Sequence, residues 1–565
     1  MKRTNCGYET VKIEKKPGII TRASGSIRIS SPTTADVFVR NHSAAISALR
    51  SETKLGRRMG IPSYFKRLTE SVRGLLSPSI QGKVSCLLVD FNCIVYGCLR
   101  SPTLPQYTVD TEEAWERALN EDVCKTLVGI WDSASRPAKV FIAVDGVVPM
   151  AKIKQQRMRR FKSVWWASKE YEMGVRKHGD ERWDTNAITP GTAYMERLGV
   201  RLQQLCSARP GWTVSTSDEP GEGEHKAMEW IRGGGVKEEG TVVVYGLDAD
   251  LILLSMLTGR EYLNQPCVLM REKTEFGKAA AKHGAAPFLF FSVQHLLKSL
   301  CPVSEEPSFL LDYVAVMCLL GNDFLPHGLT LKIRDGGHDT LLGKMRGLRA
   351  AGLTFVDYDT KKINHETFRK LFEELAQIEE AELLTAIYNK KKMRPMPPRN
   401  DSERLMMSVQ NLPVEWFVEK EFLDSGVLRA DWRDVYMQHA PAPAVAEYLY
   451  GIQWVVDYYV GRPVDKMWYY PWHLPPLWSE LASSVPQEYN VVQLSEPLKP
   501  QEQLAIVLPM ESWHLLRDKK LRRAPSILPQ FWPTRFGFVS LGKAWMWECE
   551  ADIPILTPGR LRSMA

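Results

Sequence analysis

The sequence predicts an α/β fold in which a parallel sheet is covered by helices on both faces. Two observations lead to this prediction: long apolar runs typical of buried strands, and helical patterns between them. The apolar runs are VSCLLVD (84–90), AKVFIAVD (138–145) and TVVVYGLDAD (241–250). The segments with helical spacing of apolar residues include 111–131, 150–170 and 222–232. Strands that alternate with helices favour a parallel sheet, because parallel neighbours need a crossover connection.

The three runs are rich in Val, Ile and Leu, and few polar residues interrupt them. A strand that faces water on one side alternates polar and apolar residues, whereas a strand covered on both faces does not. We therefore expect all three strands to lie inside the sheet.

The chain divides into three parts by composition. Residues 1–58 contain 12 Lys/Arg, 4 Asp/Glu and 13 Ser/Thr, without a sustained apolar period. This fits a disordered basic tail or an organelle transit peptide, and the four acidic residues favour the tail. Residues 59–345 form the expected α/β core. Residues 346–565 form a second region that we expect to be helical and rich in tryptophan, packed on the core.

Composition narrows the class of protein. No apolar run reaches the roughly 18 residues that a membrane span requires, and no signal-peptide core follows Met1. The ten cysteines form no CxxC pair or Cys/His zinc pattern, so we expect the buried, reduced thiols of an intracellular protein. A net charge of +7 permits a polyanionic partner without proving one.

Acidic residues follow each predicted strand. Asp90 and Asp145 end the first two strands, and Asp248 and Asp250 end the third. Binding sites of parallel α/β sheets form outside the carboxyl ends of the strands, so these side chains should gather at one edge. If the backbone there is extended, Asp248 and Asp250 should point the same way.

Two further segments add acidic residues. Glu222 and Glu224 flank a glycine before a predicted helix, and Asp323 follows an apolar helix. A single aspartate after a strand is usually a helix cap, but seven carboxylates at one edge would repel one another unless cations were bound. Oxygen ligands without Cys or His favour Mg²⁺ or Mn²⁺ over Zn²⁺. Two such ions would stabilise both the attacking and the leaving oxygen of a phosphodiester.

These segments belong to a longer set of motifs. The stretches are MGIPSYF (59–65), DFNCIVYGC (90–98), VDGVVPMAKIKQQRMRRF (144–161), NAITPGTAYM (186–195), PGEGEHK (220–226), YGLDADLILL (245–254), GNDFLPH (321–327), WYYPWHLPP (468–476) and AWMWECEADIPILTPGRL (544–561). They are long and specific, and over about residues 59–565 the chain resembles the XRN family of 5′→3′ exoribonucleases.

The resemblance implies a fold, an activity and a set of site residues. The fold would be the PIN-like α/β nuclease core that the family shares with flap endonucleases. The activity would be processive hydrolysis of single-stranded RNA with a 5′ monophosphate, with two Mg²⁺ ions, or Mn²⁺ as an alternative. The metal ligands and catalytic residues would be Asp90, Asp145, Glu222, Glu224, Asp248, Asp250 and Asp323.

A predicted helix carries four polar residues on one face. Lys152, Gln156, Arg159 and Arg160 follow the spacing i, i+4, i+7 and i+8. A solvated basic face explains this spacing equally well. The resemblance implies instead that these four residues hold the terminal 5′ phosphate of the RNA.

Two aromatic residues are candidates for base stacking. Tyr96 stands where the family usually has a stacking histidine, and Trp468 matches the second stacking aromatic of the family. Tyrosine can also stack on any base. A place in the hydrophobic core is the alternative for both residues.

Two other functions compete with the exonuclease. A flap-type DNA endonuclease would share the core, but FLPHGLTLKIRDGGHD (324–339) lacks the Gly-x-Gly turn of that class. A non-enzymatic RNA-binding scaffold would be favoured by loss of an acidic ligand, and none is lost. The resemblance covers the catalytic region, so we expect a compact member with an N-terminal extension. We expect a cytoplasmic protein, with nuclear and mitochondrial locations as alternatives, and protein partners in RNA decay or processing.

Overall fold

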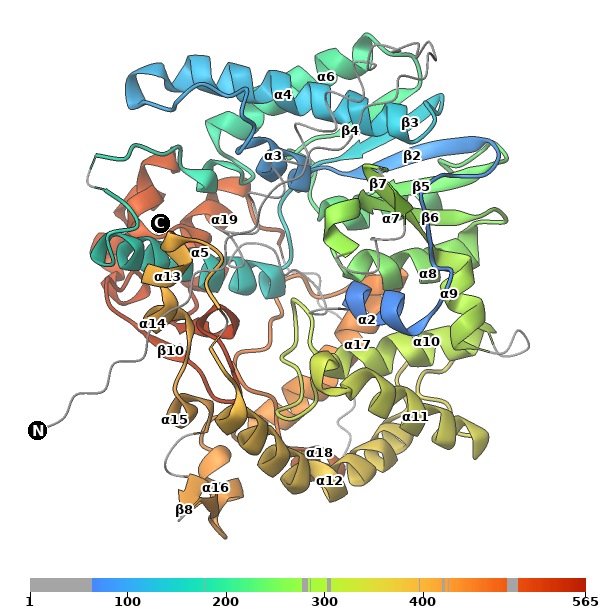
Figure 1. Ribbon diagram of the computed structural model, residues 1–565, viewed down its shortest axis with the longest axis vertical. Coiled ribbons are helices and arrows are strands. Elements are labelled where there is room, and N and C mark those ends of the chain that lie inside the picture. The colour runs from blue at the N-terminus through green and yellow to red at the C-terminus, as the bar shows by residue number, and fades with distance from the viewer. Residues whose placement is uncertain are drawn as a thin grey trace, which may run out of the picture.

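A seven-stranded, mostly parallel sheet organises the first part of the chain in the computed structural model (Figure 1). Its strands, in the order in which they lie side by side, are β1 (Leu76–Ser77), β7 (Phe288–Ser292), β6 (Cys267–Glu272), β5 (Thr241–Tyr245), β2 (Val84–Asp90), β3 (Lys139–Ala143) and β4 (Trp212–Ser215). The strands from β6 to β4 run parallel, whereas β7 pairs antiparallel with both β6 and β1. The predicted α/β fold is therefore confirmed.

The structure describes most of the chain. The described residues are 64–564 apart from 178, 277–282, 285, 302–305, 396, 419–421, 425 and 485–495. The expected basic tail, residues 1–58, lies outside them.

The three predicted strands are neighbours in the middle of the sheet. Strand β2 pairs in parallel with β3 on one side and with β5 on the other. The chain runs from β2 outward to β3 and β4, then returns across β2 to β5 and β6. This change of direction places the topological switch point beside β2, where α/β sheets open a crevice at the carboxyl ends of their strands.

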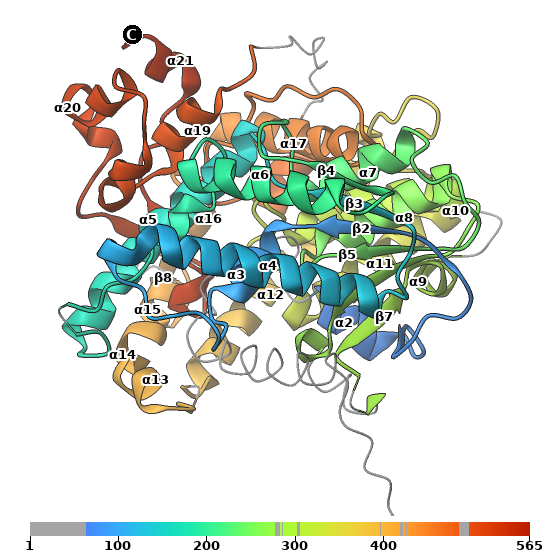
Figure 2. The ribbon, with the colours of Figure 1, turned by 90° about the horizontal axis from the view of Figure 1, so that it is seen from above.

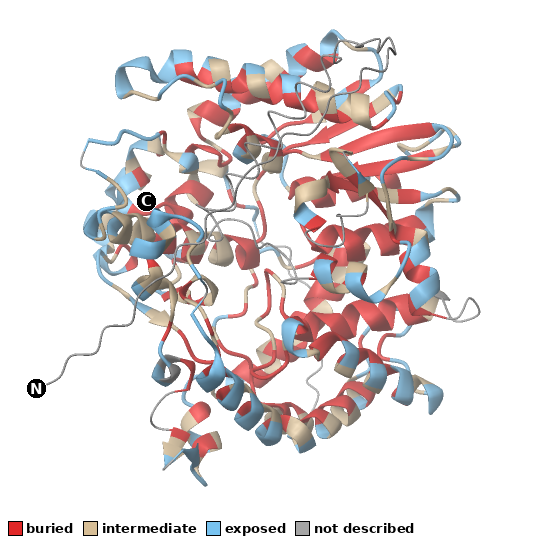
Figure 3. Ribbon diagram, viewed as in Figure 1, coloured by how far each residue is buried: buried red, intermediate tan, exposed pale blue. Residues whose placement is uncertain are grey.

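Alternate side chains of the central strands enter two hydrophobic cores. Cys86 and Leu88 of β2 face one core, and Leu87 and Val89 face the other. The first face is covered by α7 (Gly223–Arg232), α8 (Asp250–Tyr262), α9 (Val293–Leu300) and α10 (Glu306–Met317). The second is covered by α3 (Asn92–Cys98), α4 (Glu112–Ser133) and α6 (Ala193–Ser207) (Figure 2). Figure 3 shows the central strands buried along most of their length, which explains their continuous apolar runs.

Helix α5 (Met150–Glu172) follows β3 and leads away from the sheet. Its residues Ile153 and Phe161 share a third core with Leu504 and Leu508 of the second region. Helix α5 therefore joins the two parts of the chain while its other faces remain available for polar residues.

The second region of the chain is mainly helical. It comes after the sheet domain, in which α2 (Tyr64–Ser71) is the first described helix. Its helices are α11 (Gly337–Ala350), α12 (His365–Lys392), α13 (Asp401–Leu405), α14 (Met407–Gln410), α15 (Val414–Phe417), α16 (Trp432–Tyr436), α17 (Ala442–Val460), α18 (Trp478–Ser483), α19 (Pro500–Val507), α20 (Ala524–Ile527) and α21 (Pro558–Arg562). Its short strands are β8 (Leu423–Asp424), β9 (Val427–Leu428), β10 (Gly537–Val539) and β11 (Glu550–Asp552). Helix α17 packs against α8 and α10, so the second region reaches the sheet domain close to its acidic edge.

Strand β7, the cysteines and the hydrophobicity of the helices complete the description of the fold. The stretch 280–410 is largely helical, but it also contains β7, whose run FLFFS is too short to distinguish from a helix by periodicity. Eight of the nine described cysteines are buried. None of the described helices combines the length and the hydrophobicity that a membrane crossing requires.

Candidate active site

Acidic side chains from several segments meet at the carboxyl end of the central strands. Asp90 is the last residue of β2, and Asp145 follows β3. The backbone N–H of Gly223 donates to Asp145 Oδ1 at 2.7 Å, and the N–H of Asp145 donates to Asn92 Oδ1 at 3.2 Å. A Cβ atom at position 223 would lie 2.7 Å from Asp90 Oδ1, so glycine lets α7 begin against the strand ends.

The expected helix is present and begins inside PGEGEHK, at Gly223, so that its start carries two of the acids. Glu222 is the N-cap of α7, and Glu224 lies in its first turn. The ligand atoms of Glu222, Glu224 and His225 all lie within 4.8 Å of one another, and all three residues are buried. Glu224 Oε2 is buried without a hydrogen-bond partner. An unsatisfied buried acceptor is costly, so this carboxylate fits a cation that would complete its contacts.

The run 241–250 is not a strand throughout, so the condition for Asp248 and Asp250 to point the same way is not met. Strand β5 ends at Tyr245, and α8 begins at Asp250 with Ala249 already in the αR conformation. The N–H of Asp250 donates to Asp248 Oδ1 at 3.4 Å, one residue before the N-cap Ala249. Both carboxylates are nevertheless buried in the same cluster.

One lysine offsets part of the negative charge. Lys152 Nζ lies 2.5 Å from Glu222 Oε2 and 2.5 Å from Asp323 Oδ2. Gln155 Nε2 donates to the other oxygen of Asp323 at 3.3 Å. Asp323 follows the apolar helix α10, as expected, after the short turn 318–320. A single ammonium group thus faces several carboxyl groups of the cluster.

Burial and mutual repulsion raise the pKa of several of these carboxyl groups. Burial raises the pKa of Asp90, and repulsion from Asp145 adds to it. Burial, followed by repulsion from Asp248, raises the pKa of both Glu224 and Asp250. Burial also raises the pKa of Asp248, to about 6. Nearby cations favour the charged form of a carboxyl group, so bound divalent ions would counter these shifts.

The acidic cluster opens into a cavity of about 1340 Å³. The predicted site residues that line the cavity are Asp90, Asp145, Glu222, Glu224, Asp248, Lys152, Gln156, Arg159, Arg160 and Tyr96. Asp250 and Asp323 lie behind this lining, in contact with Asp248 and Lys152 respectively. The structure thus gathers the predicted acids and the predicted basic helix face around one space.

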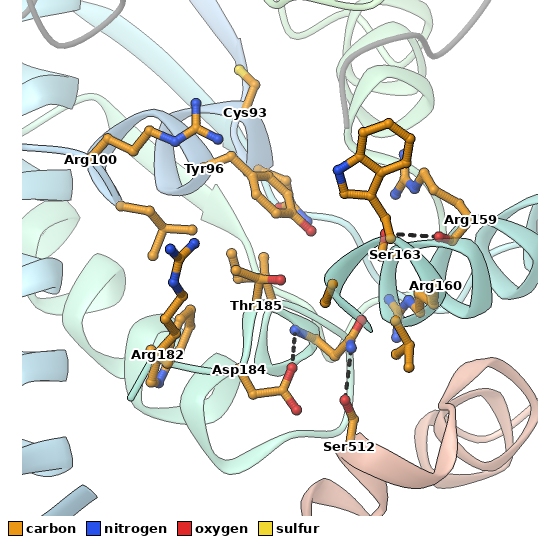
Figure 4. A pocket seen from close by; sticks show the side chains of 18 of the residues that line it. Cys93, Tyr96, Arg100, Arg159, Arg160, Ser163, Arg182, Asp184, Thr185 and Ser512 are labelled. Atoms are coloured by element: carbon orange, nitrogen blue, oxygen red, sulfur yellow. Dashed lines mark hydrogen bonds between the residues drawn. The ribbon is translucent and has the colours of Figure 1, made fainter. Parts of the chain in front are cut away.

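Helix α5 supplies hydrogen-bond donors to the cavity. Figure 4 shows Tyr96 on α3 across the cavity from Arg159 and Arg160 on α5. Arg160 Nη2 donates to Thr189 Oγ1 at 2.7 Å, whereas Arg160 Nη1 is buried without a hydrogen-bond partner. Burial lowers the pKa of Arg160 to about 10, so this guanidinium remains charged at neutral pH. It is suited to bind an anionic oxygen.

The two aromatic candidates have different surroundings. Tyr96 is 38% exposed and lines the cavity. Trp468 is 8% exposed, its Nε1 donates to Glu447 at 2.8 Å, and its ring centre lies 5.2 Å from that of Trp454. The structure therefore brings Tyr96 to the site and places Trp468 in the core of the second region, outside the cavity lining.

Several site residues have no signal in the sequence pattern. The Tyr458 hydroxyl donates to Glu222 Oε1 at 2.8 Å from a position 236 residues later in the chain. Further residues that line the cavity are Arg100, Trp166, Arg182 and Trp547. These residues come from separate segments, so only the folded chain reveals that they share a site.

Comparison with known protein families identifies both parts of the chain. The family model described as "XRN 5'-3' exonuclease N-terminus" matches residues 59–273. The model described as "Xrn1 helical domain" matches residues 432–565, and the two matches together cover more than half of the chain. The chain belongs to the XRN family. The resemblance seen in the sequence motifs is confirmed.

Named relatives within the XRN family match different shares of the chain. The "5'-3' exoribonuclease 1" of Homo sapiens is 28% identical over 590 residues, which is 89% of this chain and 34% of the human protein. The "5'-3' exoribonuclease 2" of Candida albicans is 32% identical over 353 residues, 50% of this chain and 36% of that protein. The Arabidopsis thaliana "5'-3' exoribonuclease 2" is 25% identical over 85% of this chain. The matches thus span about a third of the length of the human and Candida proteins.

Proposed function

We propose that this chain is a metal-dependent 5′→3′ exoribonuclease that degrades single-stranded RNA with a 5′ monophosphate to nucleoside 5′-monophosphates. The observation that carries the proposal is a single cavity lined by a buried acidic cluster and by the basic face of α5. An acidic cluster suits cations, and a basic face beside it suits a polyanion. The relatives named 5'-3' exoribonuclease support both the substrate class and the direction.

The acidic edge fits two divalent cations. Residues proposed to hold them are Asp90, Asp145, Glu222, Glu224, Asp248, Asp250 and Asp323. Mg²⁺ is the proposed ion and Mn²⁺ the alternative, because both prefer oxygen ligands. When bound, the ions would supply positive charge at the attacking and leaving oxygens of the phosphodiester.

The terminal 5′ phosphate would bind on α5. Its proposed partners are Lys152, Gln156, Arg159 and Arg160. The buried Nη1 of Arg160 without a partner supports this placement, because a phosphate oxygen would satisfy it. A 5′ hydroxyl would leave these donors unpaired, and a triphosphate or cap would need additional room.

Base stacking and repeated capture would complete each cycle. Tyr96 would stack on a base near the 5′ end, since its half-exposed ring faces the cavity. After one nucleotide leaves, the shortened RNA carries a new 5′ monophosphate. The same pocket on α5 can bind that group, which supports processive degradation.

The proposed layout of the chain has three parts. Residues 59–345 would be a PIN-like nuclease core, and residues 346–565 a helical, Trp-rich second region. Residues 1–58 would be a basic tail, and the protein would act in the cytoplasm with partners in RNA decay. Import of a reporter fused to residues 1–58 into mitochondria or nuclei would support the alternative locations.

A comparison of linear and circular RNA of the same sequence tests the proposal. The protein with Mg²⁺ should convert linear 5′-monophosphorylated RNA to mononucleotides and leave the circle intact, because only a free end fits the pocket. Cutting of the circle would indicate an endonuclease. Binding of both RNAs without cleavage would indicate a scaffold.

A further inference from the structure

A tyrosine of the second region contacts the acidic cluster directly. The Tyr458 hydroxyl donates to Glu222 Oε1 at 2.8 Å, while Lys152 Nζ lies 2.5 Å from Glu222 Oε2. Both carboxylate oxygens of Glu222 therefore have a defined partner, one from α17 and one from α5. Lys152 also contacts Asp323, whereas the Tyr458 hydroxyl contacts Glu222. Removing the Tyr458 hydroxyl therefore changes the contacts of Glu222 and leaves the contact between Lys152 and Asp323 in place.

The ring of Tyr458 is fixed by its neighbours. It stacks on His225 with ring centres 3.8 Å apart and on Trp454 at 4.9 Å. Phe324 meets it edge to face at 5.4 Å. His225 and Phe324 each lie next to an acidic residue of the cluster in the chain. Tyr458 thus packs against both acid-bearing segments and has little freedom to move its hydroxyl away.

The next residue of α17 also lies at the cluster. Tyr459 is buried, and its ring centre is 6.1 Å from that of His225. Two successive tyrosines of the second region therefore pack beside the helix that carries Glu224.

We infer that Tyr458 is a positioning residue through which helix α17 orients Glu222 as a metal ligand. This inference rests on the proposed function. A glutamate carboxylate rotates about several bonds, and the Tyr458 hydroxyl on Oε1 together with Lys152 on Oε2 limits that rotation, which would keep the carboxylate turned toward the acidic cluster. Residues that hold a metal ligand in this way are typically worth about 10–100-fold in metal affinity. The metal site is then complete only when α17 is packed on the sheet domain.

The test compares Mn²⁺ binding by three full-length proteins, measured from the electron paramagnetic resonance signal of free Mn²⁺. Tyr458→Phe removes only the hydroxyl and should weaken Mn²⁺ binding about 10-fold with little change in Tm. Tyr448→Phe is the matched control, because this buried tyrosine of the same helix donates to Pro326 O at 3.0 Å, outside the cluster. It should bind Mn²⁺ as the unmodified protein does.

A double-mutant cycle separates orientation of Glu222 from general packing. In a Glu222→Gln background, Tyr458→Phe should cause no further loss of Mn²⁺ affinity, because its target carboxylate is gone. Unchanged Mn²⁺ binding by folded Tyr458→Phe would overturn the inference, as would an equal loss in Tyr448→Phe. If the unmodified protein itself binds no Mn²⁺, the proposed metal site fails, which is a different result from failure of Tyr458 alone.

Discussion

Lys152 and Asp323 lie 171 positions apart in the chain, yet the Nζ of Lys152 is 2.5 Å from Asp323 Oδ2. The same Nζ is 2.5 Å from Glu222 Oε2, so one ammonium group joins the start of α5 to two acid-bearing segments. Burial would lower the pKa of Lys152, but the carboxylates of Asp323 and Glu222 raise it well above its ordinary value. Lys152 is therefore charged and stands between the acidic edge and the basic face of α5.

Lys152→Met should make the fold depend on added cations. Removing one partner of a buried ion pair typically costs about 3–5 kcal/mol, because the remaining charges are left uncompensated. In EDTA, urea unfolding should show a loss of this order relative to the unmodified protein. Added Mg²⁺ should recover part of it, since the cation can neutralise Glu222 and Asp323. Equal stability of the two proteins in EDTA would contradict this role of Lys152.

Replacing Asp248 and Asp250 together by alanine should have opposite effects on activity and stability. Hydrolysis of RNA should fall below detection, because two of the proposed metal ligands are gone. The free energy of unfolding in EDTA should rise or stay unchanged, since charge is removed from a cluster in which burial, and then repulsion from Asp248, raises the pKa of Asp250. Activity assays and urea unfolding on the same protein check both parts. Undiminished turnover would rule out the proposed ligands.

Glu379 should make the stability of the protein depend on pH outside the active site. This residue of α12 is buried, and its Oε1 accepts a hydrogen bond from the backbone N–H of Trp478 at 3.1 Å. Burial raises its pKa to about 7. Since the folded pKa lies above the unfolded value of about 4.3, its stabilising contribution is present at low pH and is lost as pH rises through about 7. Glu379→Gln should thus be more stable than the unmodified protein at pH 8, by at most about 4 kcal/mol, and similar to it near pH 4. Urea titrations at the two pH values measure this difference, and an equal effect at both would contradict it.

Tyr96→Ala should slow RNA degradation, whereas Tyr96→His should retain most of it. A stacked base is worth roughly 1–3 kcal/mol, and both tyrosine and histidine present a flat ring to a base. The change should appear mainly as a higher KM for RNA. Because Tyr96 is 38% exposed, neither substitution should change Tm much. Unfolding of Tyr96→His would indicate a core role instead.

The sheet and its acidic edge were accessible to sequence reasoning because both depend on local patterns. Continuous apolar runs identify strands that are covered on both faces, and the acids follow those strands directly. Contacts between distant segments leave no such pattern: the bond from Tyr458 to Glu222 joins residues 236 positions apart. The third strand is shorter than predicted because α8 already begins at Asp250, and a helix start cannot be placed from an apolar run alone. Trp468 matches a family motif, but its burial against Trp454 depends on the packing of the whole second region.

The proposal that this protein is a 5′→3′ exoribonuclease is tested most directly by varying the chemical group at the 5′ end of the RNA. Single-stranded RNAs of one sequence, with a 5′ monophosphate, hydroxyl, triphosphate or cap, should be incubated with the protein and Mg²⁺. The monophosphate should be degraded rapidly and the other three slowly or not at all, because only a monophosphate satisfies the donors of α5. Arg159→Ala combined with Arg160→Ala should erase this preference. Equal degradation of all four RNAs by the unmodified protein would contradict the proposed pocket and the exonuclease built on it.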